Sequence, residues 1–285
     1  MTLNLTIASP SAAYQASDFR LSEVSATGGY TTMEVKGHKQ VLAMGKGWHA
    51  SVSFTGIAKA PSVGVTNVDQ WLAQGMAKLG SFGDYSLLLD FLLSATNWLY
   101  KIRQTHRSHT FTVVGFAGPQ VFVDVISNYQ NGRGLYYEAR DQLEVFSLRP
   151  SQPQVIVTGV ERAVTRADRK LLRSQVRHRK TMQEIIETVV RVNQRASVHK
   201  ESRNLISPEC LVTSLRPNGR TYSRAFGLDD SQPYMPPSVF GNVEVDIKAI
   251  FKEAGLAGEP RLLERMTVAS WGTPEADADE ATDFT

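Results

Sequence analysis

The sequence has 285 residues, of which 42% are hydrophobic and 21% charged, and its formal net charge at pH 7 is +3. This length suffices for one large domain or two small ones with a substantial core, and the composition excludes long-range disorder. The small net charge gives no overall field that would indicate nucleic acid or a membrane as partner. The single cysteine, Cys210, excludes a disulfide within the chain and favours a reducing compartment.

Two further features bear on location. The N-terminus lacks a basic region followed by an apolar run, so we expect no signal peptide. The most apolar segment, residues 85–100, is interrupted by Asp90 and Asn97 and is shorter than a membrane span. We therefore expect a cytoplasmic protein without a membrane partner.

The first sixty residues have the alternation that is typical of half-buried strands. Leu3, Leu5 and Ile7 alternate with polar residues, which is the period of two that a strand requires. After a turn at residues 9–11, residues 12–16 are expected to return as a second strand. Further strands are expected at residues 30–35, 39–43 and 50–55.

Two pairs of predicted helices separate the later strands. The first pair comprises residues 68–79 and 84–102, for which Asn67 and Asp84 are N-cap candidates. This order of elements predicts an α+β fold. The second helix pair is expected at residues 163–176 and 182–197, and the remaining strands at residues 110–116, 121–126, 142–148, 154–158, 209–215 and 221–225.

The last sixty residues differ from the rest. We expect residues 226–272 to form a C-terminal extension, in which residues 243–254 have the pattern of a strand or a short helix. Residues 273–285 are acidic and are expected to be a disordered tail.

Residue 2 is a threonine whose position gives it chemistry that an internal threonine lacks. If an aminopeptidase removes Met1, Thr2 carries both a hydroxyl and a free α-amine, and such a residue can act as nucleophile and base at once. The predicted hairpin would bring Asp18 back beside Thr2. The residues alone therefore predict a candidate hydrolytic site, with a β-former that merely begins a strand as the plain alternative.

Four further residues follow Thr2 in an ordered series: Asp18, sixteen residues later, and then Arg20, Lys39 and Gly56. With this series the sequence resembles the proteasome β-subunit-like N-terminal nucleophile (Ntn) hydrolases, a family that includes the bacterial HslV-like peptidases.

The resemblance implies a fold and a division of roles. The fold is a four-layer αββα sandwich over residues 2–225. Thr2 would attack a carbonyl through its hydroxyl while its own α-amine takes the proton. The Lys39 ammonium, held by Asp18, would lower the pKa of that amine. The Gly56 N–H would stabilise the oxyanion, and one such donor is worth about 2.7–4 kcal/mol of barrier.

Three more residues are expected to contact substrate. By the resemblance, Arg20 lies two residues beyond the conserved aspartate position of the family motif, and Phe54 and Ala58 flank the oxyanion glycine where family members line the first specificity pocket. The alternatives are a surface charge for Arg20 and core positions for Phe54 and Ala58. Lys36 lies just upstream of Lys39 and is the alternative for its role.

Two positions depart from the family pattern. Family members have a Gly-Ser pair at the start of the third helix, whereas here Val160 occupies the serine position and cannot hydrogen-bond. They also have an aspartate three residues before a serine, whereas here Asn204 precedes Ser207. By the resemblance, Ser207 can still interact with the Thr2 α-amine. Asn204 could orient neighbouring groups, but it carries no charge.

Three functional hypotheses result. The first is a hydrolase that cleaves amide bonds, above all in peptides, within a homo-oligomer of one ring or stacked rings that a separate unfoldase could feed; a small-molecule amidase or acylase on the same fold remains open. The second is a non-catalytic structural subunit, which Val160 and Asn204 favour. No cofactor or metal is expected, because His106 and His109 lack a third ligand nearby.

The third hypothesis is a nucleic-acid-binding module, and it depends on one basic segment. No aromatic platform interleaves that segment, so a solvated face or a subunit contact is favoured over a phosphate-tracking surface. Failure to bind a polyanion resin at low salt would remove this hypothesis. The segment contains Arg162, Arg166, Arg169, Lys170, Arg173, Arg177, Arg179 and Lys180.

Overall fold

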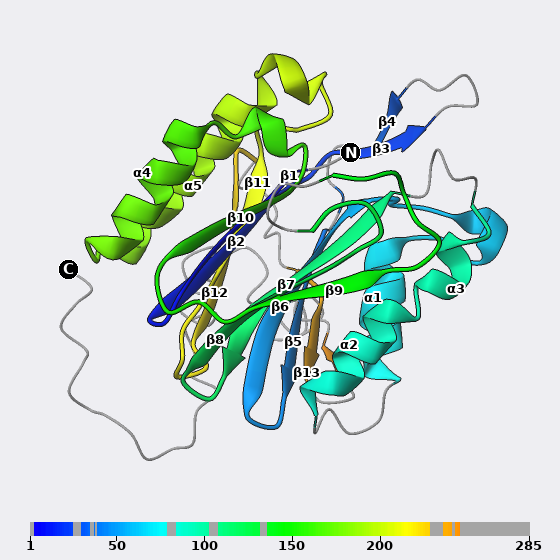
Figure 1. Ribbon diagram of the computed structural model, residues 1–285, viewed down its shortest axis with the longest axis horizontal. Helices are drawn as coiled ribbons and strands as arrows, with labels where there is room; N and C mark the ends of the chain where they lie inside the picture. The colour runs from blue at the N-terminus through cyan, green and yellow to red at the C-terminus, as the bar shows by residue number, and fades with distance from the viewer. Residues whose placement is uncertain are drawn as a thin grey trace, which may run out of the picture.

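The computed structural model describes residues 3–24, 30–34, 37, 39–78, 84–102, 108–131, 136–228, 236–240 and 243–245. Within them the chain is a mixed α/β protein in which two sheets lie face to face and helices cover their outer sides (Figure 1). Among these residues, no helix combines the length and the apolar character that crossing a bilayer demands. The α+β class predicted from the order of elements is confirmed.

The first sheet has the start of the chain at its centre. Its described strands are all antiparallel and follow the order β10-β1-β2-β11-β12. The register pairs Leu3 with Gly159 across one side of β1 and Asn4 with Ser17 across the other. The predicted N-terminal hairpin is therefore confirmed. The bounds are β1 Leu3–Ser9, β2 Ala12–Asp18, β10 Gln154–Gly159, β11 Cys210–Leu215 and β12 Thr221–Phe226.

The second sheet includes a strand from the segment expected to be an extension. Its described strands follow the order β14-β13-β5-β6-β7-β8-β9, and β13 pairs in parallel with β5, with Ser238 opposite Leu42. Part of the expected C-terminal extension therefore pairs with this sheet. The bounds are β5 Gln40–Gly45, β6 Trp48–Gly56, β7 His109–Ala117, β8 Gln120–Ser127, β9 Glu144–Leu148, β13 Ser238–Phe240 and β14 Val243–Val245; a separate ribbon pairs β3 Leu21–Val24 with β4 Tyr30–Glu34.

The helices form the outer layers. Helices α4 and α5 lie on the first sheet, and α1, α2 and α3 lie on the second (Figure 1). Both α4 and α5 begin with a capping box, formed by Thr165 with Asp168 and by Thr181 with Glu184, which satisfies backbone N–H groups of the first turn. The bounds are α1 Val68–Ala77, α2 Tyr85–Leu93, α3 Thr96–Leu99, α4 Arg166–Arg177 and α5 Met182–Ser197.

One predicted helix, residues 84–102, is divided. Asp84 caps α2 as expected, accepting a hydrogen bond from Ser86 N. At the end of α2 the Ser94 hydroxyl donates to the carbonyl of Phe91, three residues back. Such side-chain bonds to the backbone compete with a continuing helix, and a short turn separates α2 from α3.

The space between the two sheets changes character along its length. At the end near the β1–β2 turn it is apolar, with Ala8, Ala13 and Phe116 in one cluster. Toward the other end it is polar: Gln15 donates to the Thr112 carbonyl at 3.0 Å. Buried polar groups are tolerated only when they are hydrogen-bonded, so this polar layer fixes how the sheets sit on each other at the end where the candidate site lies.

Candidate functional site

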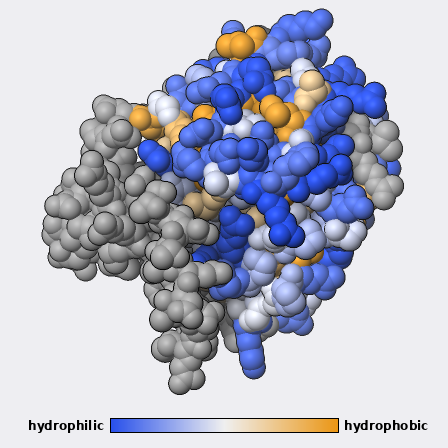
Figure 2. Space-filling view, turned by 90° about the vertical axis from the view of Figure 1, so that its left-hand side faces the viewer, coloured by the Kyte–Doolittle hydropathy of each residue, from blue (hydrophilic) through white to orange (hydrophobic). Residues whose placement is uncertain are grey.

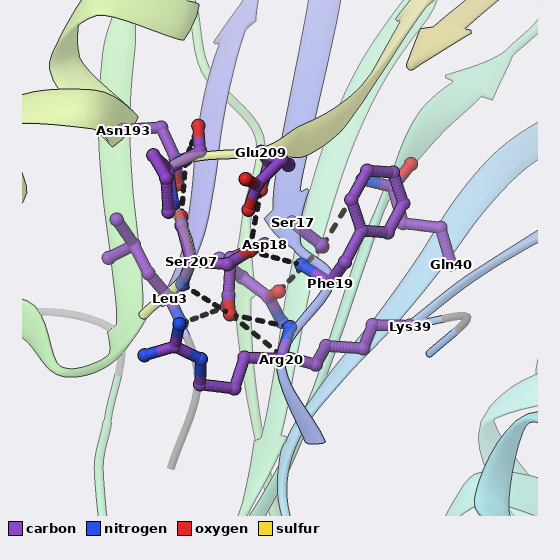
Figure 3. Close-up of polar contacts among 12 residues, drawn as sticks. Leu3, Ser17, Asp18, Phe19, Arg20, Lys39, Gln40, Asn193, Ser207 and Glu209 are labelled. Carbon is purple, nitrogen blue, oxygen red and sulfur yellow. Dashed lines mark hydrogen bonds and ion pairs between the residues drawn. The ribbon is translucent and has the colours of Figure 1, made fainter. Parts of the chain in front are cut away.

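The carboxylate of Asp18, at the end of β2, is the centre of the site. Its Oδ1 accepts a hydrogen bond from Leu3 N at 2.8 Å, and its Oδ2 accepts from Arg20 N at 3.1 Å and from Ser207 N at 3.2 Å. The Lys39 ammonium lies 3.0 Å from the same Oδ2. Figure 3 shows these groups converging on one carboxylate, which is fully buried. Strands and turns far apart in sequence are thus connected through Asp18.

Lys39 is a buried lysine whose charge is balanced, among the residues that the structure describes, by the Asp18 carboxylate. Only 1% of its side chain is exposed. The segment is held in place because Gly37 N donates to the Phe19 carbonyl at 2.9 Å, next to Asp18. Burial lowers the pKa of Lys39 from 10.5 to about 8; the Asp18 charge opposes this shift, and the Arg20 charge adds to it. A lysine in this state is mostly protonated at pH 7 and loses its proton in mildly alkaline solution.

The Lys39 Nζ has unused donor capacity. Its contact with Asp18 is an ion pair, and Nζ makes no well-directed hydrogen bond to any other acceptor among the described residues. A lysine ammonium has three donors, so at least one remains for a group outside the described set. Lys36, the alternative for this role, lies outside the described residues, as does Thr2.

Ser207 lies in a tight turn that its own hydroxyl stabilises. The Oγ accepts from Phe19 N at 3.1 Å and donates to the Glu209 carbonyl at 2.9 Å. The hydroxyl proton is therefore used inside the turn, and the contact of Ser207 with the site runs through its backbone N–H to Asp18. Its predicted interaction with the Thr2 α-amine stays a prediction.

Two residues that the sequence analysis missed support this arrangement. Asn193 on α5 donates to the carbonyls of Ser207 and Pro208 at 3.0 and 3.1 Å, which anchors the turn (Figure 3). Gln40, next to Lys39, donates to Ser17 Oγ and accepts from Thr213 Oγ1, joining the two sheets. A polar residue on the apolar face of a predicted helix was the available signal for Asn193; nothing local marked Gln40.

Arg20 and Asn204 contact each other at the rim of the site. An Arg20 guanidinium nitrogen donates to the backbone carbonyl of Asn204. Asn204 itself is exposed and has a left-handed backbone, with φ of 62°. Asn204 therefore contacts Arg20 through its main-chain carbonyl. The predicted substrate contact of Arg20 stays a prediction.

The predicted oxyanion glycine lies close to Lys39 along the second sheet. Phe54 N donates to the Lys39 carbonyl at 3.2 Å, and Gly56 ends the same strand two residues later with φ of 102°. Phe54 and Ala58, expected to line a specificity pocket, are both buried in the apolar cluster between this sheet and α1. Both side chains therefore contribute to the core, and their predicted substrate contact stays a prediction.

The position of Val160 next to the N-terminal strand follows from the register. Gly159 is opposite Leu3, and Val160 follows it, 9% exposed and packed in the apolar cluster beneath α4 and α5. The Tyr136 hydroxyl donates to the Gly159 carbonyl at 3.1 Å. A hydrocarbon side chain therefore lies beside the beginning of β1.

No protein-family model matches the sequence, and no curated protein matches it. The function is therefore argued from the geometry of the site. Within the part of the chain that the structure describes, no three histidine, cysteine or carboxylate side chains gather as metal ligands would. The arrangement that remains is a buried carboxylate–lysine pair, surrounded by backbone donors, at the beginning of a central strand.

Burial of Lys39 makes the free energy of unfolding depend on pH in the alkaline range. Because the pKa of Lys39 is about 8 in the folded protein and 10.5 ordinarily, the unfolded chain binds more protons at this residue between these pH values. The contribution of Lys39 to the free energy of unfolding should therefore rise by up to about 3 kcal/mol from pH 8 to 10.5. Urea unfolding of wild type and Lys39→Met over this range measures it; a constant difference between the two proteins would contradict the burial of a charged Lys39.

Proposed function

We propose that this protein is an N-terminal threonine hydrolase with the four-layer αββα sandwich of the Ntn hydrolases, and that it cleaves amide bonds, above all in peptides. Thr2, exposed by removal of Met1, is the nucleophile. The two stacked sheets with helices on their outer sides are compatible with this sandwich, and the pairing of β1 at the centre of the first sheet is what such a site needs.

One observation carries the proposal: Asp18 accepts the N–H of Leu3 while it pairs with Lys39. Leu3 is bonded directly to Thr2, and adjacent peptide units are rigid and short. Asp18, chosen from the sequence for its spacing from Thr2, is thus hydrogen-bonded to the residue that follows Thr2, and Lys39 lies against the same carboxylate. Surface residues with a chance spacing would have no reason to be buried together around the first described backbone nitrogen.

The chemistry follows from the roles of these groups. The Thr2 hydroxyl attacks the substrate carbonyl and the α-amine takes the hydroxyl proton, so that a covalent ester to Thr2 forms and the substrate amine leaves with that proton. Water then hydrolyses the ester. The Lys39 ammonium favours the neutral form of the Thr2 amine, Asp18 holds Lys39, and the Gly56 N–H stabilises the oxyanion.

The partners belong to the same proposal. A homo-oligomeric ring or stacked rings that enclose the sites would restrict access to unfolded peptides, and a separate unfoldase could supply them. A monomer or dimer would instead indicate a small-molecule amidase or acylase, since fold and nucleophile are shared across many substrates. The oligomeric state in solution, measured by light scattering, separates the two.

A second candidate is a non-catalytic assembly subunit. Two observations favour it: Val160 places a hydrocarbon beside the N-terminal strand, and the Ser207 hydroxyl proton is donated to the Glu209 carbonyl. Both remove hydroxyl donors that could otherwise assist the Thr2 amine. Such a subunit would keep the Asp18–Lys39 pair for stability alone.

Labelling with a threonine-directed electrophile tests the function. A β-lactone or a peptide epoxyketone should give one adduct, which peptide-level mass spectrometry should locate on an N-terminal Thr2. The adduct should be absent in Thr2→Ala, which keeps the strand. Retained Met1 without an adduct would rule out the enzyme and favour the assembly subunit, because an extended α-amine cannot act as the base.

A further inference from the structure

A pocket lies at the opposite end of the N-terminal hairpin from Asp18. It has a volume of about 630 Å³ and lies where the β1–β2 turn meets the turn between α4 and α5. Figure 1 places both turns at the same end of the molecule, and the face that carries α4 and α5 is dominated by hydrophilic residues (Figure 2). The lining residues are Ser9, Pro10, Ser11, Ala12, Tyr14, Pro153, Val176, Arg177, Arg179, Lys180, Ile185 and Arg216.

The charge of this basic pocket is one-sided. Four of its lining residues are cations, and none of the lining residues is acidic. Lys180 pairs with Glu184 at 3.2 Å, but Arg177 and Arg179 are exposed and make no ion pair within the described part of the chain. Repulsion among unpaired cations is unfavourable, so the pocket is an environment in which an anion would be stabilised.

One cation of the basic pocket is held in position. Arg216 donates from Nη1 to the Ser11 carbonyl at 3.4 Å and from Nη2 to the Tyr14 hydroxyl at 3.5 Å, and its guanidinium lies 6.0 Å from the centre of the Tyr14 ring. The Tyr14 side chain is buried. An arginine held by neutral partners keeps its full charge and the rest of its donors for a ligand.

We propose that the basic pocket binds the acidic segment of this same sequence, residues 275–283. The segment supplies the complementary charge, and no lysine or arginine follows Arg265. Its carboxylates match the forked donors of arginine, which bind carboxylates through two hydrogen bonds at once. The acidic residues are Glu275, Asp277, Asp279, Glu280 and Asp283.

Linkage within one chain makes this pairing feasible although each contact is weak. An exposed ion pair contributes only about 0.2–1 kcal/mol, which would not hold a free peptide. Segments of one chain meet at an effective concentration in the millimolar range, and residues 246–274 can span up to about 100 Å. The segment itself lies outside the described residues. The inference does not depend on the proposed hydrolase activity.

Disulfide trapping in the full-length chain tests the pairing. The native Cys210 is buried and does not interfere. In a glutathione buffer, Ser11→Cys with Asp279→Cys should form at least about ten-fold more disulfide than Val198→Cys with Asp279→Cys. Val198 is 84% exposed at the far end of α5. On a non-reducing gel the link should close within one chain; a link that forms only between copies would contradict the pairing within one chain.

Charge substitutions provide the matched control. Arg177→Glu with Arg179→Glu should reduce the disulfide yield to that of the Val198 pair, whereas Arg173→Glu, exposed on the same helix but outside the pocket, should leave it nearly unchanged. Raising NaCl from about 0.05 to 0.5 M should lower the yield. Equal yields for the Ser11 and Val198 pairs would overturn the proposal. So would binding of an oligonucleotide that requires Arg177 and Arg179 while the disulfide yield stays at the control level.

Discussion

Replacing Asp18 with alanine is expected to lower the free energy of unfolding by about 3–5 kcal/mol, because removal of one partner leaves the other charge buried and unpaired. Loss of the Asp18 carboxylate would leave the Lys39 ammonium, which is almost fully inaccessible, without its counter-charge. It would also leave three backbone N–H groups, which now share that carboxylate, without an acceptor. Urea unfolding at pH 7 measures the change. The electrophile adduct at Thr2 should also be lost, since Lys39 would no longer be held.

The double variant Asp18→Ala with Lys39→Met separates the charge from the hydrogen bonds. Removing both ions is expected to recover much of the stability lost in Asp18→Ala, since a hydrophobic side chain of similar length can replace a buried pair at little cost. The part that is not recovered measures the backbone donors left without an acceptor, each about 1–3 kcal/mol. If the double variant were as unstable as Asp18→Ala, the ion pair would not be the main stabilising interaction.

Replacing Gly56 with alanine is expected to cost at least about 3 kcal/mol, since two unfavourable effects coincide. The backbone φ of 102° is one that residues with a side chain rarely adopt, and such strain costs about 1–3 kcal/mol. A Cβ at this position would also lie 2.1 Å from the Ser108 carbonyl oxygen, so the β6 and β7 backbones would have to separate. Overpacking adds about 1–3 kcal/mol.

Gly47 offers a matched control for this substitution. It has a comparable φ of 78°, but a Cβ there would meet nothing within 4 Å. Gly47→Ala should therefore lose only the conformational part, about 1 kcal/mol. Equal losses in the two variants, measured by urea unfolding, would show that the close approach of Ser108 to Gly56 is unimportant.

The pKa of Lys39 links stability with the proposed chemistry. The reference pKa of an α-amine is about 7.7–8.0, near the value of about 8 that burial gives Lys39. Lys39 therefore keeps most of its charge at pH 7, and this charge is what would lower the pKa of the Thr2 amine in the proposed mechanism. Burial that lowers the pKa of a lysine beside a carboxylate is a feature that functional sites often show, although structural ion pairs show it too.

The sequence by itself determined the local elements and one contact of the site. The alternation of Leu3, Leu5 and Ile7 sets which faces of β1 are buried, and the hairpin turn sets the β1–β2 register. Together they bring Asp18 to the Leu3 backbone, because antiparallel pairing after a short turn leaves little freedom in register. The caps of α4 and α5 are similarly local, since each joins residues three positions apart.

Only the tertiary structure decided which distant groups reach Asp18 and in what environment. Ser207 N comes from 189 positions away, and the sheet stacking that buries Lys39 depends on Gln40, a residue without a local signature. Periodicity reports the face of an element but not the element that covers it, so the core positions of Phe54 and Ala58 were undecided. Likewise the parallel pairing of β13 with β5 depends on a long connection, whose path no local pattern specifies.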